Sequence, residues 1–125
     1  MKHLKFTITL FLLTSIIFLF CACGTVNFAK KYADIAGEYW VTIDLDGTFM
    51  KIDTNPYDLK KSSNSAALSQ IKTVLKDLGF SAAVYEDMKG TTALMGRQSV
   101  SNKKYTVSWT YHPDKGLEVL FSKKQ

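Results

Sequence analysis

The sequence predicts an α+β fold: an antiparallel sheet of about five strands, in the order β-β-α-α-β-β-β, with two helices on one face. Two kinds of spacing support this prediction. Apolar and polar residues alternate over residues 39–45 and 105–111, as they do in strands with one buried face. Between them, residues 65–78 carry apolar side chains at helical spacing. Because the 125-residue chain shows no repeat and no linker, we expect a single α+β domain over residues 37–125.

A β-hairpin is predicted around Asp46-Gly47, since Asp and Gly accept the positive φ angles of a two-residue type I′ turn. This turn sets the register, with Ile43 opposite Met50 and Val41 opposite Ile52. Every partner on the core side is then apolar or Thr. On the first strand, the residues expected to point toward the core are Tyr39, Val41, Ile43 and Leu45.

Two helices are predicted after a loop with the sequence DTNPYDLKKSSN. The first begins near Ser65 and ends at Leu78, before Gly79, which suits the left-handed position that ends a helix. Its buried face is expected to contain Ala67, Ile71, Val74, Leu75 and Leu78. The second helix follows Ser81, has the sequence AAVYEDMK and is closed by Gly90; a strand is the competing interpretation of this segment.

Three strands are expected to complete the domain. They cover roughly Thr92–Val100, Tyr105–Tyr111 and Leu117–Ser122. In the middle strand Tyr105, Val107, Trp109 and Tyr111 share the core face. The sequence His112-Pro113-Asp114-Lys115-Gly116 is typical of a turn and joins the last two strands.

The first 22 residues have the features of a secretory signal peptide. Lys2, His3 and Lys5 precede the uncharged apolar run Phe6–Phe20. As a helix, this run would span about 22 Å, which is less than the hydrocarbon core of about 30 Å. We therefore expect a signal peptide over residues 1–22, with a retained transmembrane anchor as the alternative.

The sequence Phe20-Cys21-Ala22-Cys23-Gly24 resembles the lipobox of bacterial lipoprotein precursors. In that family a diacylglyceryl group is attached to a cysteine thiol, and cleavage then makes this cysteine the N-terminus. The resemblance implies cleavage after Ala22 and lipid attachment at Cys23. Ordinary secretion, with cleavage after Ala22 or Gly24, is the alternative.

Cysteine usage agrees with lipid attachment. The only cysteines are Cys21 and Cys23, so the body cannot form an internal disulfide. A lone thiol at a mature N-terminus suits a lipid anchor, and two acyl chains hold a protein stably on a membrane. We expect residues 23–36 to form a lipidated N-terminus and tether. The protein is then exported and lipid-anchored at the cell membrane or the outer membrane.

No catalytic, cofactor or metal site is predicted. His112 is the one histidine of the body, and no second His or Cys beyond Cys23 is available to share a metal ion. The sequence also lacks the HExxH and GxSxG patterns. An enzyme that uses Asp44, Asp46, Asp53 and His112 is an alternative that requires these groups to converge in one pocket.

A binding patch is predicted on the outer side of the hairpin. Trp40, Phe49 and Lys51 lie on that side in the predicted register. If no helix covers it, two exposed aromatic rings beside a charged residue form a surface suited to a partner. The alternative is that the rings pack against the tether or a loop.

The charge of the body is modest. Beyond residue 22, the chain has 14 Lys and Arg against 11 Asp and Glu, a net charge of +3. The lysines occur as scattered pairs at 30–31, 60–61, 103–104 and 123–124. With export and no recognition motif, this charge disfavours nucleic-acid binding. Near an anionic lipid surface, each lysine would contribute up to about 1 kcal/mol if it lay within a Debye length.

Parts of the body resemble small exported bacterial proteins. The similar elements are DGT and KIDTNP within residues 46–56, GRQ around Arg97, and SWTYHPDKGLEV at residues 108–119. This resemblance implies a shared fold and transfers no activity. The expected function is that of a non-enzymatic lipoprotein that binds another envelope protein or a ligand. The alternative is an immunity or inhibitor lipoprotein that blocks an envelope-targeting toxin or hydrolase.

Overall fold

The strands and the two main helices follow the predicted order. A computed structural model describes residues 24–60 and 62–125; the predicted signal peptide (1–22) and Cys23 lie outside the described residues. The elements, in chain order, are α2 (Phe28–Lys31), β1 (Val41–Ile43), β2 (Phe49–Asp53), α3 (Ser65–Asp77), α4 (Ala82–Gly90), the 3-10 turn η1 (Ala93–Met95), β3 (Gln98–Ser101), β4 (Tyr105–His112) and β5 (Gly116–Lys123).

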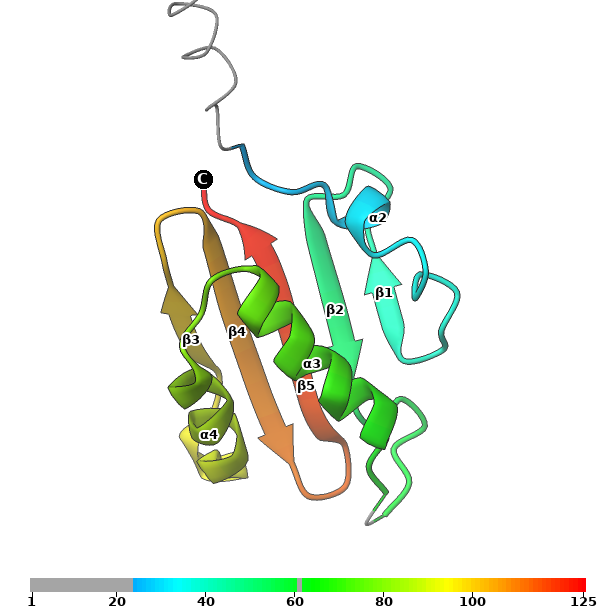
Figure 1. Cartoon of the computed structure of the whole chain (residues 1–125). Coiled ribbons are helices and arrows are strands. Elements are labelled where there is room, and N and C mark those ends of the chain that lie inside the picture. Colours follow the sequence, from blue (N-terminus) through cyan, green and yellow to red (C-terminus); the bar gives the residue numbers. More distant parts are fainter. Residues whose placement is uncertain (1–23, 61) are drawn as a thin grey trace, which may run out of the picture.

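The five strands form one antiparallel sheet in the order β1-β2-β5-β4-β3. Helices α3 and α4 lie on the same face of this sheet (Figure 1). The predicted hairpin register is confirmed, with Val41 opposite Ile52 and Ile43 opposite Met50. The α+β class and the element order are therefore as the sequence predicts.

The turn of the first hairpin differs from the predicted type I′ turn. Gly47 has a φ of +67°, but Asp46 does not have the positive φ that this turn also requires. The chain instead makes a wider loop, in which the Gly47 N–H donates to the Asp44 carbonyl (3.0 Å) and the Asp44 N–H donates to the Phe49 carbonyl (3.3 Å). This loop leaves Leu45 fully exposed, so the expectation that Leu45 points into the core is wrong.

Both predicted helices are present, and each begins at a capping side chain. The Asn64 amide oxygen accepts from the backbone N–H groups of Ala66 and Ala67 at the start of α3. The Ser81 hydroxyl caps α4 by accepting from the Ala83 N–H. Gly79 follows α3 with a φ of +82°. The competing strand interpretation of residues 82–89 is wrong.

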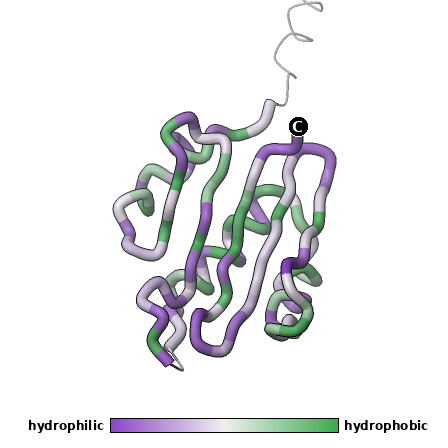
Figure 2. Tube along the Cα trace, turned by 180° about the vertical axis from the view of Figure 1, so that it is seen from behind, coloured by the Kyte–Doolittle hydropathy of each residue, from purple (hydrophilic) through white to green (hydrophobic). Residues whose placement is uncertain are grey.

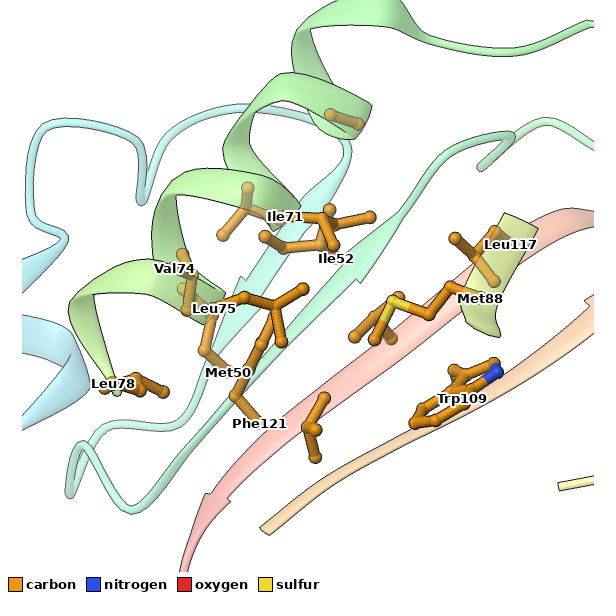
Figure 3. Packing of buried hydrophobic residues seen from close by; sticks show 14 of the residues in the cluster. Met50, Ile52, Ile71, Val74, Leu75, Leu78, Met88, Trp109, Leu117 and Phe121 are labelled. Atoms are coloured by element: carbon orange, nitrogen blue, oxygen red, sulfur yellow. The ribbon is translucent and has the colours of Figure 1, made fainter. Parts of the chain in front are cut away.

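The core lies between the helices and the covered face of the sheet. Side chains of α3, including Ile71 and Leu75, point toward Met50 and Ile52 of β2 (Figure 3). All four are nearly or fully buried. At the other side of the core, the Trp109 indole N–H donates to the Thr91 hydroxyl (2.8 Å), which joins β4 to the end of α4.

Residues 26–35 are part of the folded domain, so the predicted tether over residues 23–36 is wrong for this segment. Phe28 is fully buried and Tyr32 is 4% exposed. The Phe28 N–H donates to the Gly47 carbonyl (2.9 Å), and the Val26 N–H donates to the Tyr105 hydroxyl (2.7 Å). The physical reason is that Phe28 and Tyr32, at the C-cap of α2, are four residues apart, so their rings stack with centroids 6.2 Å apart and both join the core.

The third strand is shorter than predicted. The expected strand Thr92–Val100 is reduced to Gln98–Ser101, because residues 93–95 form η1 and Gly96 then turns the chain with a φ of +66°. Leu94 is almost completely exposed on η1. No helix among the described residues has the length and apolar character needed to cross a membrane.

The two ends of the sheet carry different segments (Figure 1). The start of the described chain, the β1–β2 turn, the β3–β4 turn and the C-terminus lie at one end, here called the N-terminal end. The segment between β2 and α3 and the β4–β5 turn lie at the opposite end, here called the loop end. A chain that leaves the domain at Gly24 therefore leaves it far from the loop end.

Candidate functional site

The predicted patch of Trp40, Phe49 and Lys51 does not form. Phe49 is 36% exposed and Lys51 is partly exposed, but Trp40 is only 6% exposed and belongs to the core. The alternation that would turn Trp40 outward does not reach it, because β1 begins at Val41. A turn precedes the strand, in which the Val41 N–H donates to the Glu38 carbonyl (3.0 Å).

On the face of the sheet opposite α3 and α4, which Figure 2 views from behind, the strand alternation places mainly polar side chains. Around Phe49 and Lys51 the neighbouring strands present mostly hydroxyl side chains: Ser122, Thr106 and Ser101 in one row, and Leu120, Ser108 and Ser99 in the next. The Lys51 ammonium lies 3.7 Å from the Glu118 carboxylate. Phe49 is therefore a single aromatic ring on a solvated surface, which is a weak basis for a binding patch.

Exposed aromatic side chains gather instead at the loop end. Tyr39 and Tyr57 are 60% and 67% exposed, and their rings stack with centroids 5.4 Å apart and planes 18° apart. Leu59, also more than half exposed, lines the same hollow of about 330 Å³ together with Pro56. We call Tyr39, Pro56, Tyr57 and Leu59 the aromatic platform. Large exposed apolar side chains that cluster in this way mark interaction surfaces.

The loop beneath the aromatic platform is fixed by a buried asparagine. Asn55 is 3% exposed, and its side-chain amide donates to the carbonyls of Leu59 (2.8 Å) and Asp114 (2.9 Å). Its amide oxygen accepts from the Leu59 N–H (3.1 Å). Next to it, the buried Thr54 hydroxyl accepts from the Leu117 N–H (2.9 Å). The loop is therefore tied both to itself and to the β4–β5 turn.

Tyr39 of the aromatic platform is held in place by a second asparagine, Asn64. The Asn64 side chain, which caps α3 with its oxygen, donates through its nitrogen to the Tyr39 hydroxyl (3.0 Å). One residue thus sets the start of the helix and the position of the Tyr39 ring. Rings that are fixed before binding lose little conformational entropy when a partner covers them.

The predicted acidic residues separate to the two ends of the sheet. Asp53 and His112 line a hollow of about 250 Å³ at the loop end, together with Asp58 and Glu118. Asp44 lies in the β1–β2 turn at the opposite end, next to Asp46. The four groups that the enzyme alternative requires therefore do not converge in one pocket. Within residues 24–60 and 62–125, no three His, Cys, Asp or Glu residues are grouped to hold a metal ion.

The environments of Asp53 and Asp44 shift their pKa values in opposite directions. Partial burial raises the pKa of Asp53, and the Glu118 carboxylate acts in the same sense, whereas a hydrogen bond from the Asn55 N–H opposes the shift. At the other end, Asp44 accepts hydrogen bonds from the N–H groups of Phe49 and Thr48, which lower its pKa. Both carboxylates thus stabilise local backbone turns. His112 does the same, since its Nδ1 accepts from the Asp114 N–H (3.1 Å).

Comparison of the chain with protein-family models, with curated proteins and with solved structures found no match. The resemblances to lipoprotein precursors and to small exported proteins therefore stay predictions from the sequence. The platform itself had a partial sequence signal, because the loop sequence NPYDL places an aromatic and an aliphatic residue within a turn.

Proposed function

We propose that the chain is a lipoprotein of the bacterial cell envelope, tethered through Cys23, which acts as a non-enzymatic binding module for another envelope protein. The observation that carries the binding role is the aromatic platform, with the stacked rings of Tyr39 and Tyr57 exposed on a hydrogen-bonded loop. The tether is supported by the signal-like residues 1–22 and by the lipobox-like sequence that ends at Cys23.

The position of Gly24 agrees with this arrangement. The described chain begins at the N-terminal end of the sheet, whereas the aromatic platform lies at the loop end (Figure 1). A lipid on Cys23 would hold the first end at the membrane and leave the platform accessible from the opposite side. Tyrosine is enriched in protein interfaces, because it combines a large apolar ring with a polar group. These features favour a protein partner.

The tether is tested by mass spectrometry of the mature N-terminus. We expect a polypeptide that begins at Cys23 and carries a diacylglyceryl group. Cys23→Ala is expected to lose the diacylglyceryl group, whereas the matched variant Cys21→Ala is expected to keep it. An unmodified N-terminus, or the same lipid mass on both variants, would contradict lipid attachment at Cys23.

The binding surface is tested by placing a photo-crosslinking amino acid in the full-length chain in the envelope. At Tyr57 we expect crosslinks to one protein, and these are expected to fall at least about tenfold when Tyr39 is also changed to Ala. A crosslinker at Phe49 is the matched control, since it probes the sequence-predicted patch on the open face of the sheet.

The identity of the captured protein separates the two functional candidates. An envelope assembly component supports the binding module, whereas a one-to-one complex with a toxin or hydrolase supports the immunity or inhibitor lipoprotein. Stronger crosslinking from Phe49 than from Tyr57 would overturn the role of the aromatic platform.

A further inference from the structure

Three of the four lysine pairs, which are scattered in the sequence, meet at the N-terminal end of the sheet. These pairs are Lys30-Lys31, Lys103-Lys104 and Lys123-Lys124. The backbone N–H of Lys124 donates to the Lys104 carbonyl (2.8 Å), and that of Lys123 donates to the Thr48 carbonyl (3.2 Å). Helix α2, which carries Lys30 and Lys31, is tied to the same turn at Gly47.

The lysines of this end keep their charges available. The two ion pairs between described residues join Lys51 to Glu118 and Lys89 to Glu86, and neither involves these six lysines. The six lysines outnumber the side-chain carboxylates in this part of the domain. These four carboxylates belong to Asp34, Asp44, Asp46 and Asp77. Figure 2 shows hydrophilic residues on the chain around the C-terminus and the adjacent β3–β4 turn.

An apolar side chain projects from the same end. Leu45 is fully exposed at the tip of the β1–β2 turn, where no other part of the described chain covers it. A surface that combines several lysines with an exposed leucine is suited to the headgroup region of an anionic bilayer, where the charges meet phosphate groups and the leucine reaches the acyl boundary.

The proposed tether would place this end close to the membrane. Val26, whose N–H is hydrogen-bonded to the Tyr105 hydroxyl, lies three positions after Cys23. Three extended residues span at most about 10 Å, which is close to the Debye length of about 8 Å at physiological ionic strength. This step rests on the proposed function, whereas the clustering of the lysines does not.

We propose that the N-terminal end is a docking surface for anionic phospholipids. The six lysines and Leu45 contact the bilayer, fix the tilt of the domain on it and direct the aromatic platform away from the lipid. The lipid anchor supplies attachment, and the lysines supply orientation. Neutral bilayers are expected to hold the anchored domain without orienting it.

The test is amine labelling of the full-length chain in vesicles, read by mass spectrometry. Vesicles of phosphatidylcholine alone are compared with vesicles that also contain phosphatidylglycerol. In the anionic vesicles we expect labelling of Lys30, Lys103 and Lys124 to slow by about fivefold or more, and added salt to reverse this. Lys72 and Lys115, which are exposed outside this end, are the internal controls. Equal labelling in both kinds of vesicle would overturn the proposal.

A matched pair of triple variants removes the same number of charges from the two parts of the molecule. Lys30→Gln/Lys103→Gln/Lys124→Gln is expected to abolish the protection of the remaining lysines of the end, Lys31, Lys104 and Lys123. Substitution of Lys60, Lys72 and Lys115 by Gln is expected to leave that protection unchanged. Equal effects of the two triple variants would show a response to total charge only and would contradict the docking surface.

This experiment is separable from the test of the lipid anchor. From its apolar sequence, the run Phe6–Phe20 of the unprocessed chain is expected to associate with vesicles whether or not Cys23 carries a lipid. An unmodified Cys23 combined with lysine protection would reject the tether and keep the docking surface. A lipidated Cys23 without protection would keep the tether and reject the docking surface.

Discussion

The two ends of the sheet bury and expose opposite kinds of side chain. At the N-terminal end, the aromatic rings of Phe28 and Tyr32 are buried, and the charged side chains of Lys30 and Lys31 beside them are exposed. At the loop end, the polar Asn55 is buried and the aromatic rings of Tyr39 and Tyr57 are exposed. Both ends are well hydrogen-bonded, so this difference does not reflect a poorly ordered loop.

The contrast shows how the loop end is able to present aromatic rings. A loop that satisfies its backbone groups through a buried polar side chain does not need apolar residues to hold it in place. Its aromatic residues then remain free for contact with a partner. The N-terminal end uses its aromatic rings to stabilise the domain, and its lysines and Leu45 are left for contact. The N-terminal end, whose aromatic rings are buried in the core, is therefore the end expected to face the lipid.

The largest predicted effect tests whether α2 belongs to the domain. Phe28→Ala removes a fully buried ring and is expected to lower the free energy of unfolding by about 3–5 kcal/mol, measured by urea denaturation. Lys31→Ala, on the exposed side of the same helix, is the control and is expected to change it by less than about 0.5 kcal/mol. Similar stability for both variants would mean that this segment is a tether after all.

A second prediction compares two asparagines that hold corresponding turns at the two ends. Asn55 fixes the loop end, while the Asn102 side chain donates to the Leu78 carbonyl (2.9 Å) and accepts from the N–H groups of Lys104 and Tyr105. Substitution of either by Ala is expected to cost about 2–3 kcal/mol of unfolding free energy, because buried or half-buried backbone groups lose their partners.

The readout that separates these two variants is binding. Asn55→Ala is expected to weaken crosslinking from Tyr57, because the platform loses its support, whereas Asn102→Ala is expected to leave it intact. Crosslinking is measured at a temperature where both variants remain folded. Equal loss of crosslinking in the two variants would show that stability, rather than the arrangement of the loop end, controls binding.

A smaller effect is predicted for two glycines. Gly116 has a φ of +74°, and a Cβ there would lie 2.7 Å from the Thr54 hydroxyl oxygen, so Gly116→Ala is expected to destabilise the protein by about 1–2 kcal/mol. At Gly90, in α4, a Cβ meets no atom within 4 Å. Gly90→Ala is therefore expected to stabilise it by about 0.5–1 kcal/mol. Thermal unfolding is expected to give a lower melting temperature than the wild type for Gly116→Ala and a higher one for Gly90→Ala.

The sequence predicted those parts of the fold that depend on hydrophobic period. Alternation in β1 and β2 fixed their register, because a slip by one residue would turn Met50 and Ile52 to solvent. The face of α3 followed from spacing in the same way. Phe28 and Tyr32 were missed although their i, i+4 spacing is a helical signal, because one turn of helix is too short to show a period.

The aromatic platform was less predictable than the fold. Alternation assigned Tyr39 to the core and Trp40 to the surface, and the structure reverses both, since β1 is too short to extend the pattern to them. The burial of Asn55 depends on carbonyl groups of Leu59 and Asp114, of which the second is distant in the sequence. The local sequence pattern does not indicate a hydrogen-bond partner that is distant in the sequence. A single sequence therefore does not reveal which polar loop residues are buried.

The smallest predicted effect concerns the two aspartates at opposite ends of the sheet. The folded state lowers the pKa of Asp44 below its ordinary 3.8, so its contribution to stability is present above that pH and is lost as the pH falls through the folded-state pKa. The folded state raises the pKa of Asp53, so its contribution has the opposite sign: it is present below pH 3.8 and is lost as the pH rises through the folded-state pKa.

Urea unfolding of two variants over a range of acidic to neutral pH separates these contributions. At neutral pH, Asp44→Asn is expected to be less stable than the wild type, because the turn loses a charged acceptor for the Thr48 and Phe49 N–H groups. Asp53→Asn is expected to be at least as stable, because Asn keeps the acceptor for the Asn55 N–H without the charge next to Glu118. The two differences from the wild type are expected to diminish as the pH falls and both carboxylates become protonated. A loss of the same sign from both variants at neutral pH would mean that the two ends of the sheet do not differ in how they hold a negative charge.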